Sequence, residues 1–303
     1  MAEVSAPRPV AVIGLGCIGG SLARALVAQE VEVRGWSDSA SDRAQAAAAQ
    51  VHIAGNEVEG GAAACAGAGI VVLAVPIQTV REVVGSVLGS LSRSAQVLHV
   101  GGLQAREAVG LDEVLYERVL GTHPLAGSHD SGFAASRPEL FVDAAVSVEA
   151  RASARARQCI EWLWYTVGAR RIDYRSAESH DRLMAWVSQL PQLTATALAA
   201  TLSAGGVDAR AVGTGARDTT RLAASDLGSW PALFRGSPSD LHEALVSLEE
   251  TIANLRRALE NGDSATLSAI WDVARAWRRE GDGSSAERLR GRTTQGSGME
   301  RHS

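Results

Sequence analysis

The sequence contains no lysine, since all 29 of its basic residues are arginine. This absence excludes Schiff-base chemistry and a lysine general base. Any bound anion must therefore be held by arginine, a backbone N–H or a polar side chain. The hydrophobic content of 46% and the charged content of 21% are typical of a folded globular protein rather than a disordered one.

Cysteine is scarce as well. Cys17, Cys65 and Cys159 are too few and too scattered for a disulfide framework or a cysteine-type zinc site. We therefore expect a protein of the reducing cytoplasm. Histidine and carboxylate residues show no metal-ligand spacing either, so no metal site is expected.

Long apolar runs and excess positive charge are also missing. No apolar run approaches the ~18–20 residues that span a bilayer, and the N-terminus lacks the basic and then apolar regions of a secretory signal. The net charge of −5 argues against nucleic acid or an anionic membrane as the main partner. A small-molecule ligand is the expected partner.

Short β-rich runs alternate with alanine-rich helical stretches in the first half of the chain. The expected strands occupy 9–16, 31–36, 69–76, 95–102, 117–124 and 143–150, and the expected helices 20–29, 41–50, 79–92 and 105–116. Val, Ile and Leu are almost continuous in the strands, which indicates burial on both faces, as in a parallel sheet. The pattern predicts an α/β fold with an N-terminal, doubly wound, Rossmann-type sheet.

The periodicity changes to helical after a last expected strand at 169–174. An apolar stripe runs along one helix through Leu241, Leu245, Leu248, Ile252, Leu255 and Leu259, and a second stripe follows within 263–277. Two such helices predict an all-α domain that buries its stripes against a second subunit, and hence a homodimer. The expected organisation is a flexible 1–7, a dinucleotide-binding domain at 8–152, a helical substrate and dimerisation domain at 153–280, and a disordered tail at 281–303.

A glycine-rich turn stands directly between the first expected strand and helix. In this turn Gly14, Gly16 and Gly19 have the spacing G-x-G-x-x-G. The first glycine permits the tight turn, the second lets the backbone approach a pyrophosphate, and the third lets helix and strand pack closely. The helix N-terminus adds N–H donors for the phosphates. A dinucleotide cofactor, NAD or NADP, is therefore predicted.

Further cofactor contacts are expected around this turn. They are Leu15, Cys17 and Ile18 within it, and Ala74, Val75 and Pro76 at the end of the third long strand. The second strand leads to Ser37 and then Asp38. A carboxylate there would repel a 2′-phosphate, which favours NAD over NADP.

Three later segments carry a family resemblance. They are "GTHPLAGSHDSGFAASRPELF" (121–141), "SHDRLMAWVSQLPQ" (179–192) and "ARDTTRLAASDLGSW" (216–230). Together with the glycine-rich turn, this sequence resembles the prephenate/arogenate dehydrogenases of tyrosine biosynthesis from about residue 8 to residue 280. Members of that family pass a hydride from a cyclohexadienol to a nicotinamide while the ring carboxylate leaves as CO2.

The resemblance implies roles for individual residues. His123 is the expected base, and Arg221 is expected to hold the ring carboxylate as a two-pronged donor. Trp230 and His129 are expected near the substrate. The alternatives are that His123 only bonds to loop backbone, that His129 is a polar loop residue, and that Trp230 packs in the core. The pair His180–Asp181 reads as a cap of the following helix.

Two motifs depart from the family pattern. The family's Asp-Val-Gly-Ser-Val-Lys reads "HVGGLQ" here, with Gly102 in place of the serine and Gln104 in place of the lysine. The family's Ser-His-Leu-Pro-His reads "SQLPQ", so that Gln189 and Gln192 replace both histidines. Gly102 and both glutamines are still expected at the substrate site, but a neutral amide holds a carboxylate less strongly than a charged group does.

These departures leave the substrate open. Oxidative decarboxylation of prephenate or arogenate is the leading hypothesis. A relative in specialised metabolism that acts on a 4-amino-4-deoxyprephenate-like compound is the first alternative, and a cofactor-binding protein with decayed catalysis is the second. A dehydrogenase for another small hydroxy acid is disfavoured, because those relatives usually carry a catalytic lysine.

Overall fold

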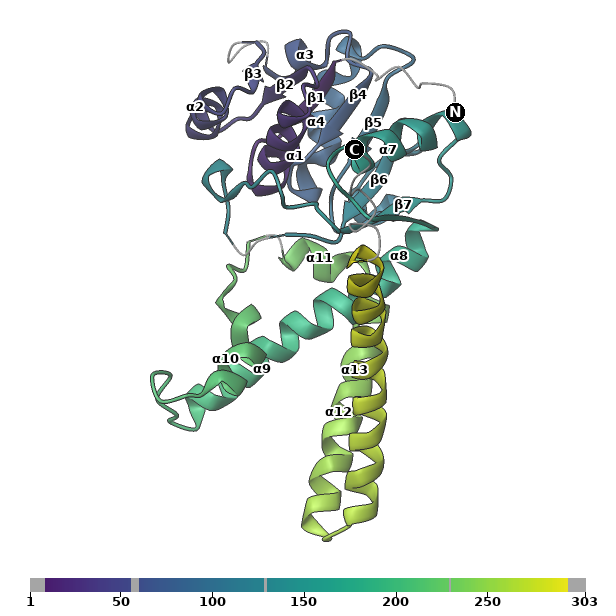
Figure 1. The fold of residues 1–303 in the computed structure, drawn as a ribbon. Coiled ribbons are helices and arrows are strands. Elements are labelled where there is room, and N and C mark those ends of the chain that lie inside the picture. The colour runs from purple at the N-terminus through teal and green to yellow at the C-terminus, as the bar shows by residue number, and fades with distance from the viewer. Residues whose placement is uncertain (1–8, 56–59, 128–129, 229, 294–303) are drawn as a thin grey trace, which may run out of the picture. The chain divides into compact units, whose positions relative to one another are not determined.

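A computed structural model describes residues 9–55, 60–127, 130–228 and 230–293 (Figure 1), and for 281–293 the backbone alone. The chain forms two compact units that divide between His242 and Glu243. The first unit contains the sheet and the helices that follow it, and the second contains most of a helical pair. No helix in the described ranges is both long enough and apolar enough to cross a membrane.

One eight-stranded sheet organises the first unit, in the order β3-β2-β1-β4-β5-β6-β7-β8. Its strands are β1 (Val10–Ile13), β2 (Val33–Trp36), β3 (His52–Ile53), β4 (Ile70–Leu73), β5 (Gln96–His99), β6 (Val119–Pro124), β7 (Ala145–Glu149) and β8 (Arg171–Arg175). The strands from β3 to β6 are parallel, β7 runs antiparallel to β6, and β8 is parallel to β7. The order reverses at β1 and β4, and ligands of such sheets bind at that point, beyond the carboxyl ends of the strands.

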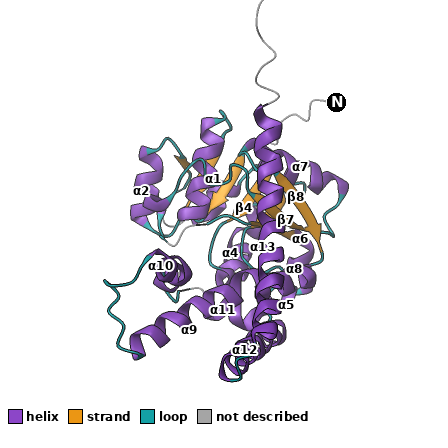
Figure 2. Cartoon of the chain, turned by 60° about the horizontal axis from the view of Figure 1, so that its bottom comes forward, coloured by secondary structure: helices purple, strands orange, loops and turns teal. Residues whose placement is uncertain are grey.

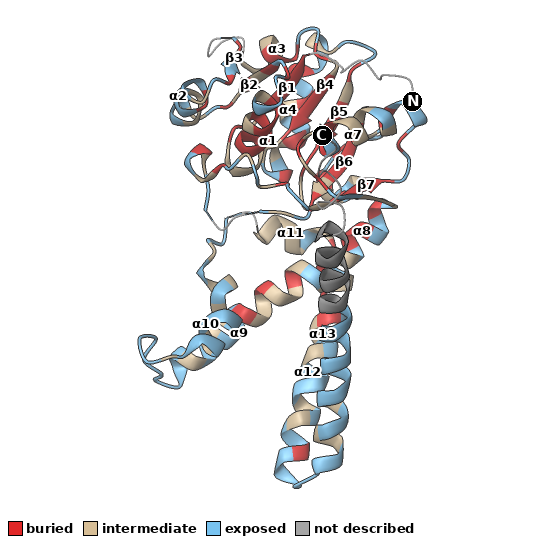
Figure 3. Ribbon diagram, viewed as in Figure 1, coloured by how far each residue is buried: buried red, intermediate tan, exposed pale blue. Residues whose placement is uncertain are grey.

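Helices cover both faces of this sheet (Figure 2). They are α1 (Cys17–Ala28), α2 (Ala40–Ala48), α3 (Gly60–Cys65), α4 (Val80–Val87), α5 (Arg106–Val109), α6 (Glu113–Arg118) and α7 (Ala154–Thr166). Alternate residues of β1 enter different cores: Val10 and Val12 pack with α1 and α7, and Ala11 and Ile13 pack with α3 and α4. All four are buried (Figure 3), which confirms the predicted doubly wound α/β fold.

A helical part follows the sheet, as predicted. It consists of α8 (Ala177–Met184), a π-helical turn (Ala185–Gln189), α9 (Leu190–Ala204), α10 (Thr214–Thr220), the 3-10 turn η5 (Arg221–Ala224), α11 (Trp230–Gly236), α12 (Pro238–Glu260) and α13 (Ser264–Thr293). The chain reverses between α12 and α13 at Gly262, whose φ of +65° suits glycine. Trp271 and Trp277 on α13 are 63% and 74% exposed in the single chain.

The expected domain boundary at residue 152 lies too early. The sheet continues through β8 to Arg175, and Ile160, Leu163 and Trp164 of α7 are fully buried in its core. An isolated β7 would leave one face and one edge uncovered, so β8 and α7 complete the first domain.

Other elements differ in extent from the prediction. The expected helix at 105–116 is two helices, because Gly110 ends α5 with a φ of +74° and Asp112 caps α6. The short β3 and α3 were not predicted. Helix α13 continues to Thr293, past residue 280 where a disordered tail was expected to begin, since extending a helix costs less than starting one.

Candidate active site

The glycine-rich turn is shaped to receive a dinucleotide. Gly14 has a φ of +90°, and a Cβ on it would lie 2.4 Å from the carbonyl oxygen of Ala74. A Cβ on Gly19 would lie 1.9 Å from the Gly14 carbonyl oxygen, so only glycine lets α1 pack this closely. A Cβ on Gly16 would meet nothing within 4 Å, so the backbone there is open to a ligand. This geometry fits the pyrophosphate of NAD or NADP beside the N-terminus of α1.

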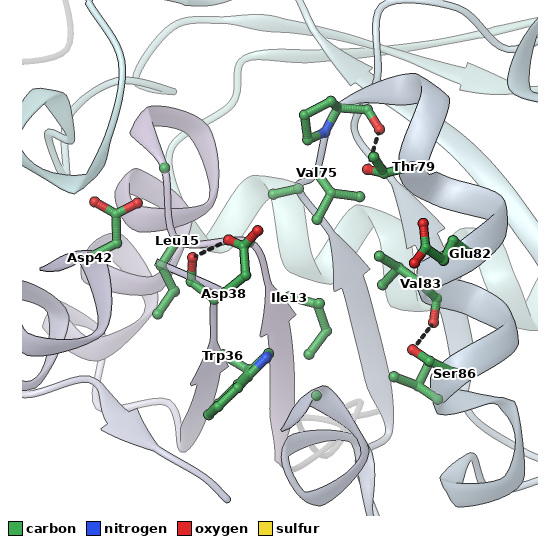
Figure 4. A pocket seen from close by; sticks show the side chains of 17 residues that line it. Ile13, Leu15, Trp36, Asp38, Asp42, Val75, Thr79, Glu82, Val83 and Ser86 are labelled. Atoms are coloured by element: carbon green, nitrogen blue, oxygen red, sulfur yellow. Dashed lines mark hydrogen bonds between the residues drawn. The ribbon is translucent and has the colours of Figure 1, made fainter. Parts of the chain in front are cut away.

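A cavity of about 480 Å³ adjoins this turn (Figure 4). Of the predicted cofactor residues, Gly14, Leu15, Gly16, Ser37, Asp38, Ala74, Val75 and Pro76 line it. Sequence reasoning missed further residues that line it. Trp36 lies at the end of β2, and Glu82 and Val83 line the side of the cavity formed by α4. Trp36 offers an aromatic face on which a nucleotide base of the cofactor can stack.

Three predicted cofactor residues do not line this cavity. The Cys17 thiol donates to the Ala135 carbonyl oxygen at 3.4 Å, and burial raises the pKa of that thiol. Ile18 packs against the hydrophobic core, and Gly19 lies against Gly14. These three residues pack against other parts of the protein on the side of the turn away from the cavity. They therefore support the conformation of the turn without lining the cavity.

The charge of the cavity is negative. Asp38, Asp42 and Glu82 line it, and no arginine is among the described residues of its lining. Arg43 lies nearby, where its guanidinium donates to the carbonyl oxygens of Ser37 and Asp38 at 2.7 and 3.0 Å and stands 4.6 Å from the centre of the Trp36 ring.

His123 is the first member of a chain of hydrogen bonds. Its side chain is half-buried on β6, and its Nδ1 lies 3.0 Å from Nε2 of His180 on α8. Nδ1 of His180 lies 2.7 Å from Oδ1 of Asp181. His180 and Asp181 are 0% and 1% exposed. We call this chain of three residues the relay.

The loop after β5 anchors the relay. Backbone N–H groups of Gln104 and Ala105 donate to the Asp181 carboxylate at 2.8 and 2.9 Å. The alternative interpretation of His180–Asp181 as a helix cap is wrong, because Ser176 caps α8 instead. The only sequence signal for the relay was the adjacent His-Asp pair at the start of a helix.

These bonds fix the hydrogen positions in the neutral rings. The carboxylate of Asp181 only accepts, so Nδ1 of His180 carries a hydrogen and its Nε2 accepts from Nδ1 of His123. Nε2 of His123 is then left as an acceptor. Burial, and to a lesser extent the rings of His180 and His99, lowers the pKa of His123 to about 3. His123 is therefore neutral at physiological pH, as a base must be.

The buried His99 makes the free energy of unfolding depend on pH. It is 1% exposed, its Nδ1 accepts from the Gly101 N–H at 3.3 Å, and burial, then His180 and Arg151, lowers its pKa to about 3. The unfolded chain takes up this proton below about pH 6.5 and the folded chain does not, so stability is lost as pH falls from 6.5 towards 3.

Urea unfolding at pH 7.5 and 4.5 measures this loss. We expect the wild type to lose about 2–3 kcal/mol more than His99→Asn between these pH values. Asparagine keeps an acceptor for the Gly101 N–H but does not titrate. Equal losses in the two proteins would show that His99 is not held neutral by the fold.

A second cavity, of about 620 Å³, contains three of the predicted substrate residues, Gln192, Arg221 and Trp230. Arg221 begins η5, and Trp230 begins α11 and stacks on Phe234 at 5.5 Å between ring centres. The remaining lining consists of Gly127, Asp130, Ser131, Val187, Ser188, Pro191, Leu222, Ser225, Asp226, Gly228 and Leu233. Among the described residues, the cavity thus combines one guanidinium with two carboxylates and an apolar wall.

Two other predicted substrate residues, Gln189 and Gly102, do not line this cavity. Gln189 is 2% exposed and does not line the cavity, because its amide nitrogen donates to the Leu233 carbonyl oxygen at 3.2 Å. Gly102 lies beside His123, because a Cβ on it would stand 3.9 Å from Nε2 of that histidine. His129 falls outside the described residues. The described residues contain no group of three His, Cys, Asp or Glu side chains that could hold a metal.

The fold agrees with the family comparison. The nucleotide-binding domain of prephenate dehydrogenase matches residues 22–173, and the prephenate dehydrogenase dimerization domain matches residues 176–272. The chain belongs to the prephenate dehydrogenase family. It is an NAD(P)-dependent dehydrogenase, and the domain boundary of the family falls at the end of β8.

The individual relatives have low sequence identity to this chain. The chain is 29% identical over 272 residues to a cyclohexadienyl dehydrogenase of Zymomonas mobilis, which covers 86% of this chain and 91% of that protein. A prephenate dehydrogenase of Bacillus subtilis is 24% identical and covers 89% of this chain and 75% of its own length. The structure of the A. aeolicus prephenate dehydrogenase with hydroxyphenyl propionate and NAD+ has a TM-score of 0.79 at 24% identity, covering 90% and 97% of the two chains.

Proposed function

We propose that this protein oxidatively decarboxylates a cyclohexadienyl acid of the prephenate or arogenate type to an aromatic product. The observation that carries the proposal is the relay, which leaves Nε2 of His123 as an acceptor at the carboxyl edge of the sheet. The glycine-rich turn and the Arg221 cavity belong to the same unit. A protein with decayed catalysis would have no need to keep this relay.

His123 starts the reaction in this proposal. Its Nε2 takes the proton of the ring hydroxyl, and the positive charge that develops on the imidazole is shared through Nδ1 with His180 and balanced by Asp181. The lowered pKa of about 3 keeps the ring neutral before it takes the proton. A dinucleotide held at the glycine-rich turn would supply the nicotinamide that accepts the C4 hydride, and loss of CO2 from the ring makes the product aromatic.

Arg221 is the proposed ligand of the ring carboxylate. It is the single arginine among the described residues that line the second cavity, and the sequence contains no lysine to replace it. A guanidinium binds a carboxylate through two parallel hydrogen bonds. Trp230 and Leu233 complete an apolar wall against which the ring can lie.

The charges of both cavities bear on cofactor and substrate choice. Asp38, Asp42 and Glu82 would repel a 2′-phosphate, which favours NAD. Asp130 and Asp226 line the substrate cavity and favour a substrate with an ammonium group, such as arogenate or an amino-substituted analogue, over prephenate. The 4-amino-4-deoxyprephenate-like compound remains the second candidate for that reason.

Turnover assays test the proposal. Purified protein is incubated with prephenate, arogenate or the 4-amino analogue, together with NAD or NADP, and the reduced nicotinamide is followed by absorbance. We expect turnover with at least one compound, and a kcat/KM at least about tenfold higher with NAD than with NADP, the effect of one repelled phosphate. Cofactor binding without turnover of any compound would refute the proposed reaction.

We infer a homodimer through α12 and α13, which works in the cytoplasm. The matched dimerization domain and the exposed Trp271 and Trp277 support the dimer, since large apolar side chains on a helix face are commonly covered by a second subunit. The cysteines Cys17, Cys65 and Cys159 are all free, which suits a reducing compartment.

A further inference from the structure

Three positions that depart from the family pattern, Gly102, Gln189 and Gln192, all contact one segment of the chain. This segment comprises residues 221–228 and 230–236, that is, η5, the following loop and α11. We call it the wall segment, because it supplies Arg221, Trp230 and five other residues that line the substrate cavity.

Gln192 holds the first part of the wall segment. Its amide nitrogen donates to the Leu222 carbonyl oxygen at 3.0 Å and to the Ser225 hydroxyl at 2.9 Å, and that hydroxyl donates to the same carbonyl at 2.9 Å. Because the carbonyl oxygen only accepts, the nitrogen of the amide must face η5. The side chain is 6% exposed. These bonds fix the turn that begins with Arg221.

Gln189 holds the second part. It ends the π-helical turn Ala185–Gln189 and donates its amide nitrogen to the Leu233 carbonyl oxygen of α11 at 3.2 Å. Its amide oxygen is buried without a hydrogen-bond partner among the described residues, so the nitrogen's bond to α11 is the polar contact that orients this side chain. A π-helical turn costs stability and often marks a functional site.

Gly102 lets α11 come close to the base. A Cβ at this position would lie 3.3 Å from Cδ2 of Leu233 and 3.9 Å from Nε2 of His123. A Cβ at Gly236, at the end of α11, would lie 2.2 Å from Cδ1 of Leu103. Two glycines thus permit close packing between α11 and the loop after β5, and Leu233 stands beside the position that a side chain at 102 would occupy.

We propose that Gln189 and Gln192 are positioning residues that hold Arg221 and Leu233 in place through the wall segment. The inference rests on the proposed function for the roles of Arg221 and Leu233. The two amides act through backbone carbonyls rather than by touching the ring carboxylate. They keep their donors at every pH, so the grip on the wall segment does not titrate as a histidine grip would.

Hydrogen exchange tests the anchoring without any substrate. Amides of the wall segment are compared in the wild type, Gln189→Leu and Gln192→Leu, and we expect exchange about tenfold faster in the variants, since each loses the donor of a buried bond. The matched control is Thr201→Val, further along α9, whose hydroxyl donates to the Ala197 carbonyl oxygen of its own helix at 2.8 Å. Exchange in the wall segment should stay at the wild-type rate there. Wild-type rates in both leucine variants would overturn the proposal, whether or not the protein turns over any cyclohexadienyl acid.

Kinetics distinguish positioning from simple loss of fold. With a compound that the wild type accepts, Gln192→Leu and Gln192→Glu should raise KM about tenfold with little change in kcat, because neither side chain offers a donor. Gln192→His regains an N–H donor and should restore KM to within about threefold of the wild type. Glutamate matches glutamine in shape, so this comparison stands even if the leucine variant does not fold. A fall in kcat at unchanged KM, or equal KM values for Gln192→Glu and Gln192→His, would overturn the proposal.

Discussion

The variant His123→Asn is expected to lose about 10²–10⁴-fold in kcat, the contribution of a positioned general base. Asparagine can still bond to His180, but it cannot take a proton from the substrate. Cofactor binding, measured by fluorescence titration with NADH, should be unchanged, because the described residues that line the cofactor cavity belong to β1, β2, α2, α3 and α4 and their adjoining loops and do not include His123. The base and the cofactor site are thereby separated in one variant.

The pH profile gives a second measurement on the same residue. A base acts in its neutral form, and the lowered pKa of about 3 keeps His123 neutral well below pH 6.5. We therefore expect kcat/KM to show no acid limb near 6.5, with activity declining only further towards pH 3 or where the fold is lost. His52→Asn, an exposed histidine on β3, serves as control and should behave as the wild type. Wild-type kcat in His123→Asn would refute the assignment of the base.

The variant Asp181→Asn should be almost as damaging, with kcat reduced about 100-fold or more, because loss of the carboxylate permits the wrong tautomer in the relay. An amide group cannot accept from His180 and from both backbone N–H groups at once. The buried donors left without a partner should also lower the free energy of unfolding by about 1–3 kcal/mol.

Activity and stability are measured separately for this variant. The kcat is determined well below the midpoint of thermal unfolding, and the free energy of unfolding comes from urea titration. Asp208→Asn is the matched control, because Asp208 pairs with the exposed Arg210 at 3.0 Å and such surface pairs contribute little. If Asp181→Asn kept full kcat while losing stability, the role of Asp181 would be structural alone.

Local sequence patterns predicted the glycine-rich turn, whereas the relay depends on contacts between residues far apart in the sequence. Gly14, Gly16 and Gly19 perform mechanical tasks within one turn, so their spacing alone indicates them. His180 is separated from His123 by 57 residues, and Asp181 from Gln104 by 77. No periodicity relates such positions, and only the packing of α8 against the sheet brings them together.

The glutamines illustrate a second reason why part of the site could not be predicted from the sequence. Gln189 and Gln192 were predicted at the substrate because histidines stand there in the family. The residue type does not say that their amide nitrogens face backbone carbonyls of the wall segment. Replacing a charged ring by an amide changes which partner is preferred, and that choice depends on the carbonyl groups within reach. The place of Gln192 at the second cavity was predictable in this case, and the hydrogen-bond partners of the two amides were not.

The hydrogen bonds from Gln104 and Ala105 to Asp181 also have a consequence for folding. They join the loop after β5 to α8, across the boundary between the two family domains. A chain cut after Arg175 would leave the buried acceptors and donors of both pieces exposed to water or unpaired. The relay therefore forms only when α8 has packed against the loop after β5, and we expect the sheet and α8 to unfold together.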